Sequence, residues 1–254
     1  MKTAQLVDRL DAELDTAAYA DVDASPNGLQ IGSRSGTVET VGCAVDAAAA
    51  TFESAISAGV DMLCTHHGVI WGGVERVTGR SYELVSKLDR AELDLYVSHL
   101  PLDGHQTLGN AAGLASYLDV TSTSPFGEIA GLPIGQAGQF DQSTSLDRLA
   151  SSLEALPTDG GQIRTFPFGP SDIKTVAIVT GSGADFLDQA ATAGVDVYIT
   201  GEGKQKLYHE AREREINVIL SGHYATETFG IENLASEIEQ WGVDTQIFTH
   251  PTGL

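Results

Sequence analysis

The sequence predicts an α/β protein built of two duplicated halves, each with helices on both sides of a mostly parallel sheet. Three observations favour this class: apolar strand-like runs alternate with helical patterns, one strand–helix–strand segment occurs twice, and polar residues follow the strands at their carboxyl ends. We place the first half at residues 1–124 and the second at residues 125–254, with the C-terminal segment returning to the first half. A metal site is expected at the strand ends between the halves.

In order, the elements expected in the first half are a helix over residues 3–19, a turn at 25–28, a short strand over 29–32, a strand over 38–45, a helix from a cap at Asp46 to Ala58, a strand over 60–64, a helix over 82–90 and a strand over 93–98. The opening helix carries Leu6, Leu10 and Leu14 on one face. Gly59 ends the Ala-rich helix, and the strands around that helix form a βαβ unit, which predicts parallel pairing with a right-handed crossover.

Residues 121–139 are rich in Ser, Thr and Gly, include two prolines and show no long periodic pattern, so we expect a connection between the halves. Residues 144–147 resemble a capping box, which predicts a helix from there to Leu156.

The second half then repeats the first. Thr175-Val176 matches Thr40-Val41, and Ala193–Asp196 matches Ala58–Asp61 at the same offset. At the end of the repeated strand, Gly201-Glu202 stands in place of the paired histidines. A duplicated architecture explains these matches better than chance.

Two adjacent histidines, His66 and His67, follow the strand over 60–64. Successive strand side chains point to opposite faces, so the rings are expected to diverge unless Gly68 turns the chain. The pair can bind metal, or one ring can be a histidine of the core.

His223 and Glu227 are one helical turn apart, a spacing that fits a metal-binding pair and a helix-capping arrangement equally well. His99 and Asp103 flank Pro101, which predicts a loop between them. The candidate ligands together are His66, His67, His99, Asp103, His223 and Glu227. This nitrogen and oxygen set suits Zn, Fe, Mn or Co and is large enough for two ions.

Gly181-Ser182-Gly183 follows another apolar strand and invites comparison with a phosphate-binding loop. Phe186 stands where the dinucleotide fingerprint requires a third glycine, so a tight turn is the better interpretation.

The composition is strongly acidic, with 35 Asp and Glu residues against 14 Lys and Arg residues and a formal net charge of −21. This balance is typical of proteins from salt-loving microbes, because molar salt shortens the Debye length to about 3 Å and screens self-repulsion. An ordinary acidic cytosolic protein is the alternative. Nucleic-acid surfaces need clustered cations, so we expect no nucleic-acid partner.

No apolar run approaches the ~20 residues of a membrane span, and the N-terminus lacks the apolar segment of a signal peptide. Cys43 and Cys64 stand inside apolar runs, where a free thiol packs as a small hydrophobe. We therefore expect a cytoplasmic protein with no disulfide and no membrane partner.

Five motifs in order resemble the Nif-three-like proteins, often labelled type 2 GTP cyclohydrolase I. They are residues 27–32 (Asn-Gly-Leu-Gln-Ile-Gly), 65–68 (Thr-His-His-Gly) with 71–73 (Trp-Gly-Gly), 98–103 (Ser-His-Leu-Pro-Leu-Asp), 200–202 (Thr-Gly-Glu) and 222–227 (Gly-His-Tyr-Ala-Thr-Glu). The chain departs from the family where Gly68 replaces a frequent proline, and where Lys204-Gln205 replaces a lysine with paired histidines. It resembles the short form of the family, without the large inserted domain.

The resemblance implies a toroidal homohexamer with two divalent ions per subunit, of Fe, Zn or Mn. One ion would take His67, Asp103 and Glu227, and the other His66, His223 and Glu227, with His99 lining the same site. We expect His99 to be a catalytic residue that carries a proton. The function expected is metal-dependent hydrolysis of a nucleotide or phosphorylated small molecule. The alternative is a non-catalytic protein that binds metal, handles a metallocofactor or regulates a partner.

Overall fold

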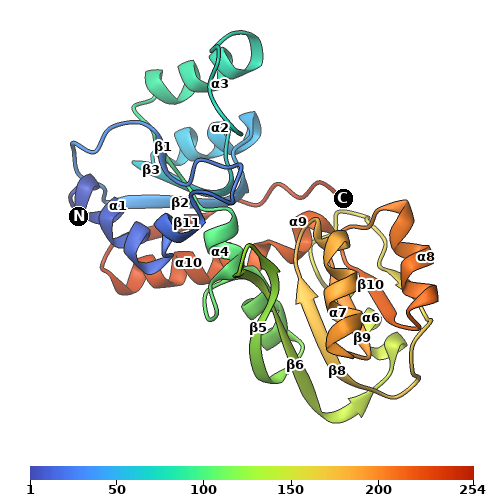
Figure 1. Ribbon diagram of the computed structural model, residues 1–254. Coiled ribbons are helices and arrows are strands. Elements are labelled where there is room, and N and C mark those ends of the chain that lie inside the picture. Colours follow the sequence, from blue (N-terminus) through green and yellow to red (C-terminus); the bar gives the residue numbers. More distant parts are fainter. The chain divides into compact units, whose positions relative to one another are not determined.

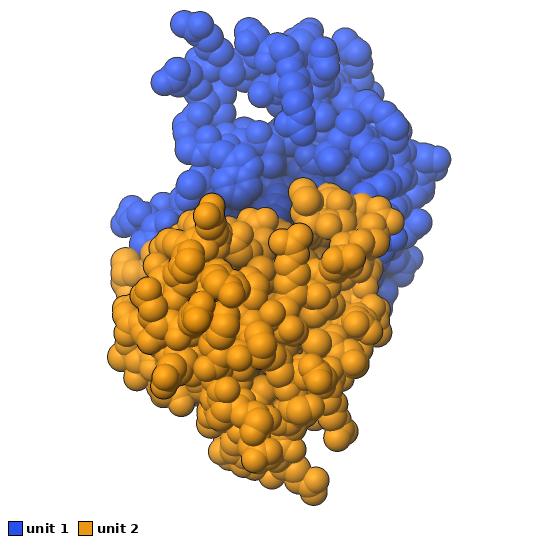
Figure 2. Space-filling view, turned by 90° about the vertical axis from the view of Figure 1, so that its right-hand side faces the viewer, with its two compact units in different colours: residues 1–102, 231–250 blue, residues 103–230, 251–254 orange.

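The strands form two separate sheets in the computed structural model, which describes residues 1–254 (Figure 1). The chain divides into two compact units, coloured separately in Figure 2: unit 1 comprises residues 1–102 and 231–250, and unit 2 comprises residues 103–230 and 251–254. The chain passes between the units within α4 (Leu100–Gly104), within α10 (Thr228–Gln240) and once more at residues 250–251.

Unit 1 holds a five-stranded sheet in the order β1-β4-β3-β2-β11. Its elements are α1 (Thr3–Glu13), the short 3-10 helix η1 (Thr16–Tyr19), β1 (Gly28–Ile31), β2 (Thr40–Asp46), α2 (Ala49–Ala58), β3 (Met62–His67), α3 (Gly79–Arg90), β4 (Asp94–Val97), most of α10 and β11 (Asp244–Ile247). All neighbouring strands are parallel except β1 and β4. Phe52 of α2 and Leu88 of α3 pack with Leu63 of β3 in the core, and α1 and α10 lie on the other side of the sheet (Figure 1).

Unit 2 holds a six-stranded mixed sheet in the order β5-β6-β8-β9-β10-β7. Its elements are α5 (Asn110–Tyr117), β5 (Thr121–Ile129), β6 (Leu132–Thr144), α6 (Leu146–Leu153), β7 (Arg164–Phe166), β8 (Ile173–Val179), the 3-10 helix η2 (Gly183–Phe186), α7 (Leu187–Ala193), β9 (Val197–Thr200), α8 (Gln205–Glu213), β10 (Asn217–Leu220) and α9 (His223–Thr226). The three central strands, β8, β9 and β10, are parallel. Leu114 of α5 and Leu153 of α6 pack with Ile178 of β8 in the core of this unit.

The sequence repeat is confirmed down to its hydrogen bonds. In unit 1 a carboxylate oxygen of Asp61 accepts from the backbone N–H of Thr40 at 3.0 Å, and in unit 2 Asp196 accepts from that of Thr175 at 2.8 Å. The helices before these aspartates end at Gly59 and Gly194, with φ of +72° and +71°. Each aspartate therefore ties the start of one strand to the start of the next.

The prediction that residues 121–139 only connect the halves is wrong. They form β5 and most of β6, a long hairpin whose two-residue turn places Ala130 and Gly131 at φ of +50° and +84°. Positive φ at both positions is typical of the two-residue hairpin turns whose twist matches that of the strands, and the most common sequence in such turns is Asn-Gly. Pro125 is tolerated because β5 is an edge strand, and Pro133 because it stands at the start of β6.

Two local predictions around the site are also wrong. Residues 100–104 form the helix α4 and not a loop, because Pro101 occupies the first turn, where its missing N–H has no acceptor to lose. Asp46 does not cap α2, whose cap position is Ala48; it is the last residue of β2. None of the helices combines the length and the apolarity that crossing a bilayer requires.

Candidate metal centre

Three histidines gather in unit 1 where β3 and β4 end. His66 and His67 are the last residues of β3, and His99 follows β4 by two residues. Their ring centroids are 4.6 to 5.7 Å apart, and one nitrogen from each ring lies within 4.8 Å of the other two. The rings of His66 and His67 thus do not diverge, since both lie against His99.

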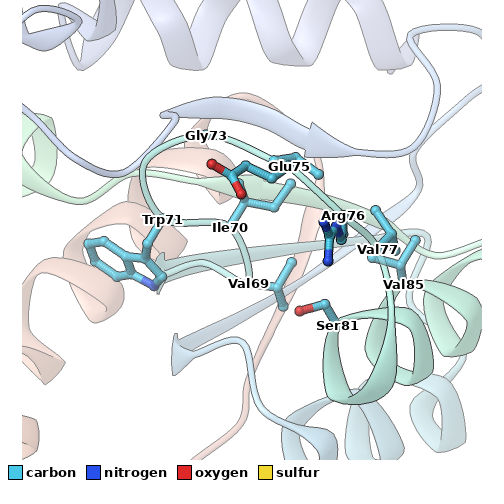
Figure 3. Close-up of a pocket in the computed structure, with 10 residues that line it drawn as sticks. Val69, Ile70, Trp71, Gly73, Glu75, Arg76, Val77, Ser81 and Val85 are labelled. Carbon is cyan, nitrogen blue, oxygen red and sulfur yellow. The ribbon is translucent and has the colours of Figure 1, made fainter.

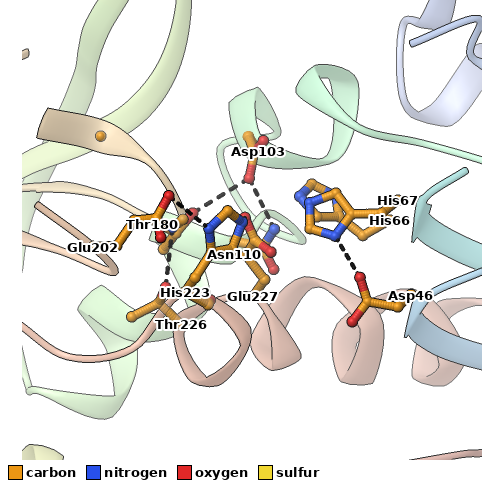
Figure 4. A network of polar contacts seen from close by, with 12 residues as sticks. Asp46, His66, His67, Asp103, Asn110, Thr180, Glu202, His223, Thr226 and Glu227 are labelled. Carbon is orange, nitrogen blue, oxygen red and sulfur yellow. Dashed lines mark hydrogen bonds and ion pairs between the residues drawn. The ribbon is translucent and has the colours of Figure 1, made fainter. Parts of the chain in front are cut away.

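Each of these imidazoles has its Nδ1 at an oxygen of the protein. His66 Nδ1 lies 2.9 Å from the backbone oxygen of Ser98, and His67 Nδ1 lies 2.8 Å from a carboxylate oxygen of Asp46 (Figure 4). His99 Nδ1 lies 2.9 Å from Asp23. A carbonyl or carboxylate oxygen only accepts, so each Nδ1 carries the hydrogen and the lone pair of the neutral ring is on Nε2. Metal-binding histidines are held in this way.

Asp23 and Asn27 fix the position of His99. The side chain of Asp23 is only 1% exposed, and its second oxygen accepts from Asn27 and from the backbone N–H of Leu100. Asn27 in turn accepts from the backbone N–H of His99 at 2.7 Å. Burial raises the pKa of Asp23, but the hydrogen bond and charge of His99, with the hydrogen bonds from Asn27 and the Ser25 N–H, bring it below its usual value.

A second group of possible ligands lies in unit 2. His223 begins α9 and Glu227 follows that helix, so the two side chains share a face, with 3.1 Å between His223 Nε2 and Glu227 Oε1. On the other side of the ring, Nδ1 lies 3.3 Å from Glu202 (Figure 4). Burial alone would lower the pKa of His223, but the hydrogen bonds and negative charges of Glu227 and Glu202 raise it to about 9.

Asp103 completes the group in unit 2. It is 8% exposed, and its Oδ1 accepts from Asn110 at 2.8 Å and from Thr180 at 3.3 Å (Figure 4). A carboxylate oxygen of Asp103 lies within 4.8 Å of one of Glu227, which is 3% exposed. Two buried carboxylates this close repel each other unless a proton or a cation lies between them.

The glycine turn after β8 packs against this group. The N–H groups of Gly181 and Gly183 donate to the hydroxyls of Thr226 and Thr200, both at 3.0 Å, so the turn is not an open phosphate-binding loop. Gly181 has a φ of +58°, and a Cβ on it would lie 2.1 Å from Glu227 Oε1. The tight-turn interpretation is confirmed, and the turn leaves room for the carboxylate.

The three histidines of unit 1 form a group that could hold a metal ion, and Asp103, His223 and Glu227 of unit 2 each belong to another such group. These groups offer imidazole nitrogens or carboxylate oxygens and no thiolate, a donor set typical of Zn, Fe, Mn or Co. The cysteines play no part, since Cys43 and Cys64 are fully buried free thiols whose pKa values burial raises. Buried His, Asp and Glu groups of this protein could therefore hold a metal ion.

Sequence reasoning missed the residues that orient the candidate ligands. The sequence predicts a helix cap at Asp46 and has no motif that includes Asp23 or Asn110. Asn27 alone lies in a motif, the one at residues 27–32, and also in the predicted turn at 25–28.

Comparison with known proteins identifies relatives over the full length. A sequence model of the family Duf34/NIF3 (NGG1p interacting factor 3) matches residues 1–252. Proteins named GTP cyclohydrolase 1 type 2 homolog from Halobacterium salinarum and Pyrococcus abyssi are 49% and 40% identical, with 100% of both chains covered in each case. The crystal structure of TTHA1606 from Thermus thermophilus is 37% identical with a TM-score of 0.88, again over 100% of both chains. The structure of protein ybgI, described as of unknown function, is 32% identical with a TM-score of 0.90 over the same coverage.

Proposed function

The chain belongs to the Duf34/NIF3 family, and from this premise we propose that it binds two divalent metal ions and hydrolyses a nucleotide or another phosphorylated small molecule. The observation that carries the proposal is that Nδ1 of each of the three histidines is hydrogen-bonded to an oxygen of the protein. In each neutral ring the lone pair is then on Nε2, the atom that would bind a metal ion. The names of the relatives favour a nucleotide substrate such as GTP.

We assign one ion to His67, Asp103 and Glu227 and the other to His66, His223 and Glu227. This assignment follows the ligand pattern that the family resemblance implies for these residues. Two divalent ions would polarise a substrate oxygen and lower the pKa of a bound water toward about 7.

In this proposal His99 carries a proton between substrate and solvent. Its partner Asp23 is 1% exposed, whereas Asp46, the partner of His67, is 32% exposed. A buried carboxylate holds its hydrogen-bond partner in one orientation, so the ring of His99 is the more firmly positioned of the two for a proton transfer. The hydrogen bonds of Asn27 hold this arrangement in one orientation.

We further propose that the protein is a cytoplasmic homohexamer adapted to molar salt, as the family resemblance and the net charge of −21 imply. Sedimentation in molar KCl is expected to give the mass of six chains. A monomer under these conditions would refute the hexamer.

Metal loading and activity test the function together. The protein is purified in molar KCl, loaded with Fe, Mn or Zn, and assayed with GTP and simple phosphoesters. We expect Glu227→Gln to abolish turnover with the fold intact, while the same change at Glu232, an exposed residue of α10, leaves it unchanged. Metal binding without turnover on a broad panel would instead favour a non-catalytic metal-binding or regulatory protein.

Metal content tests the ligands independently of turnover. His66→Ala or His223→Ala is expected to reduce the content well below two ions per chain, and His209→Ala, at an exposed histidine, is the matched control. An unchanged metal count in either variant would remove that residue from the ligands. Anomalous scattering at several metal edges would then identify the ions.

A further inference from the structure

Trp71 lies against the histidine group without being buried. Its ring centroid is 5.0 Å from that of His99, nearly perpendicular at 81°, and 6.1 Å from that of His67. Its Nε1 donates to the backbone oxygen of Gly68 at 3.2 Å, yet the residue remains 46% exposed. An indole with its polar atom satisfied and much of its apolar surface exposed can contact a flat ligand at little conformational cost.

The backbone on both sides of Trp71 is held in place. Gln30 of β1 accepts from the N–H groups of Val69 and Ile70 at 2.8 and 2.9 Å, and donates to the oxygen of Ile70 at 3.4 Å. On the other side, the N–H of Gly72 donates to the oxygen of Ala24 at 2.6 Å. The exposed ring therefore stands on a fixed backbone, as pre-organised binding requires.

Trp71 also borders a cavity of about 510 Å³ that Val69, Val77 and Val85 line beside α3. Its indole is directed away from Val77 and Val85 (Figure 3). The ring contacts of Trp71 are with His67 and His99.

We propose that Trp71 is a specificity-determining residue that stacks on a planar heteroaromatic ring of the substrate, such as a nucleobase, beside the histidine group. This inference rests on the proposed function and names the part of the substrate that the protein recognises. Every base has a π face, so Trp71 selects for the presence of a flat ring and not for one base.

Fluorescence tests the contact without relying on turnover. The chain has two tryptophans, and the contacts of Trp241 are with Arg9, which lies over its ring, and with Glu237, to which its Nε1 donates. Trp241→Phe leaves Trp71 as the only indole, and its emission is expected to be quenched saturably by guanosine but not by ribose 5-phosphate. Quenching by neither compound, or by both equally, would overturn the proposal.

Calorimetry with guanosine on the metal-loaded protein measures the size of the effect. Trp71→Leu is expected to weaken guanosine binding by roughly 5- to 150-fold, the factor that stacking one base provides. Trp71→Phe should keep most of the affinity for guanosine, and Trp241→Phe should keep all of it. Metal content should be unchanged in all three. Unaltered guanosine affinity in Trp71→Leu would overturn the stacking role. Guanosine binding with full metal content but no turnover would contradict the proposed hydrolysis and leave the stacking role of Trp71 intact.

Discussion

Alanine at position 181 tests whether Glu227 must keep the position that the structure gives it. Gly181 has a φ of +58°, and an added Cβ would lie 2.1 Å from Glu227 Oε1 and 3.2 Å from His223 Nε2. Real Cβ contacts are essentially never shorter than 3.0 Å. The carboxylate therefore has to retreat by about 1 Å, or the turn has to deform.

Two separate effects follow from this substitution. The left-handed backbone conformation costs an alanine about 1–2 kcal/mol of folding free energy. A displacement of about 1 Å is several times the ~0.2 Å tolerance of a metal–ligand distance. We therefore expect metal affinity to fall by at least 10–100-fold, the usual effect of disturbing groups around a metal site.

Gly194→Ala separates the two effects. Gly194 is in the same unit and has a φ of +71°, and nothing lies within 4 Å of the position that a Cβ would take, so alanine there meets only the backbone strain. Calorimetric metal titration and urea unfolding of both variants provide the comparison. We expect Gly181→Ala and Gly194→Ala to lose similar amounts of unfolding free energy. Only Gly181→Ala should also lose metal affinity. Wild-type metal affinity in Gly181→Ala would show that Glu227 Oε1 is not a ligand in this position.

Three further predictions concern charge and hydrogen bonding. In protein stripped of metal, Glu227 and Glu202 raise the pKa of His223 from 6.5 to about 9. Protonated His223 therefore stabilises the fold fully below about pH 6.5, and this stabilisation is lost as the pH rises through 9. In His223→Ala, the free energy of unfolding should depend less on pH over that range. Asp46→Asn removes the carboxylate at His67 Nδ1 and should weaken metal binding by about 10–100-fold in a titration, whereas an unchanged affinity would exclude this orienting role. Because the net charge is −21, the thermal midpoint should rise between dilute buffer and molar KCl, and equal midpoints would refute the adaptation to salt.

The duplicated architecture could be predicted because its signals are local and occur twice. Apolar runs, the glycines that end the two helices, and the aspartates after them stand at the same spacing in both halves, and Asp61 and Asp196 make the same hydrogen bonds. The residue types at the strand ends indicate the candidate ligands, because open α/β sheets bind their ligands at the carboxyl ends of the strands.

The hairpin of β5 and β6 was missed because its alternation is weak and its turn is Ala-Gly. A strand is stabilised by its neighbours in the sheet as much as by its own side chains, so a polar sequence can form one when β8 is available to pair with it. The helix α4 was missed because proline disrupts a helix only beyond its first turn, and the sequence does not show where a short helix begins.

The sequence by itself determined the α/β class, the repeat, and the nitrogen and oxygen donors offered by His66, His67, Asp103, His223 and Glu227. Only the tertiary structure decided how those donors are oriented, because the local pattern predicts a helix cap at Asp46 and assigns no role to Asp23 or Asn110. A carboxylate within 3 Å of an imidazole nitrogen sets the tautomer of that ring. Such a distance depends on which strands and loops are neighbours in space, and neighbours in space are not neighbours in the sequence.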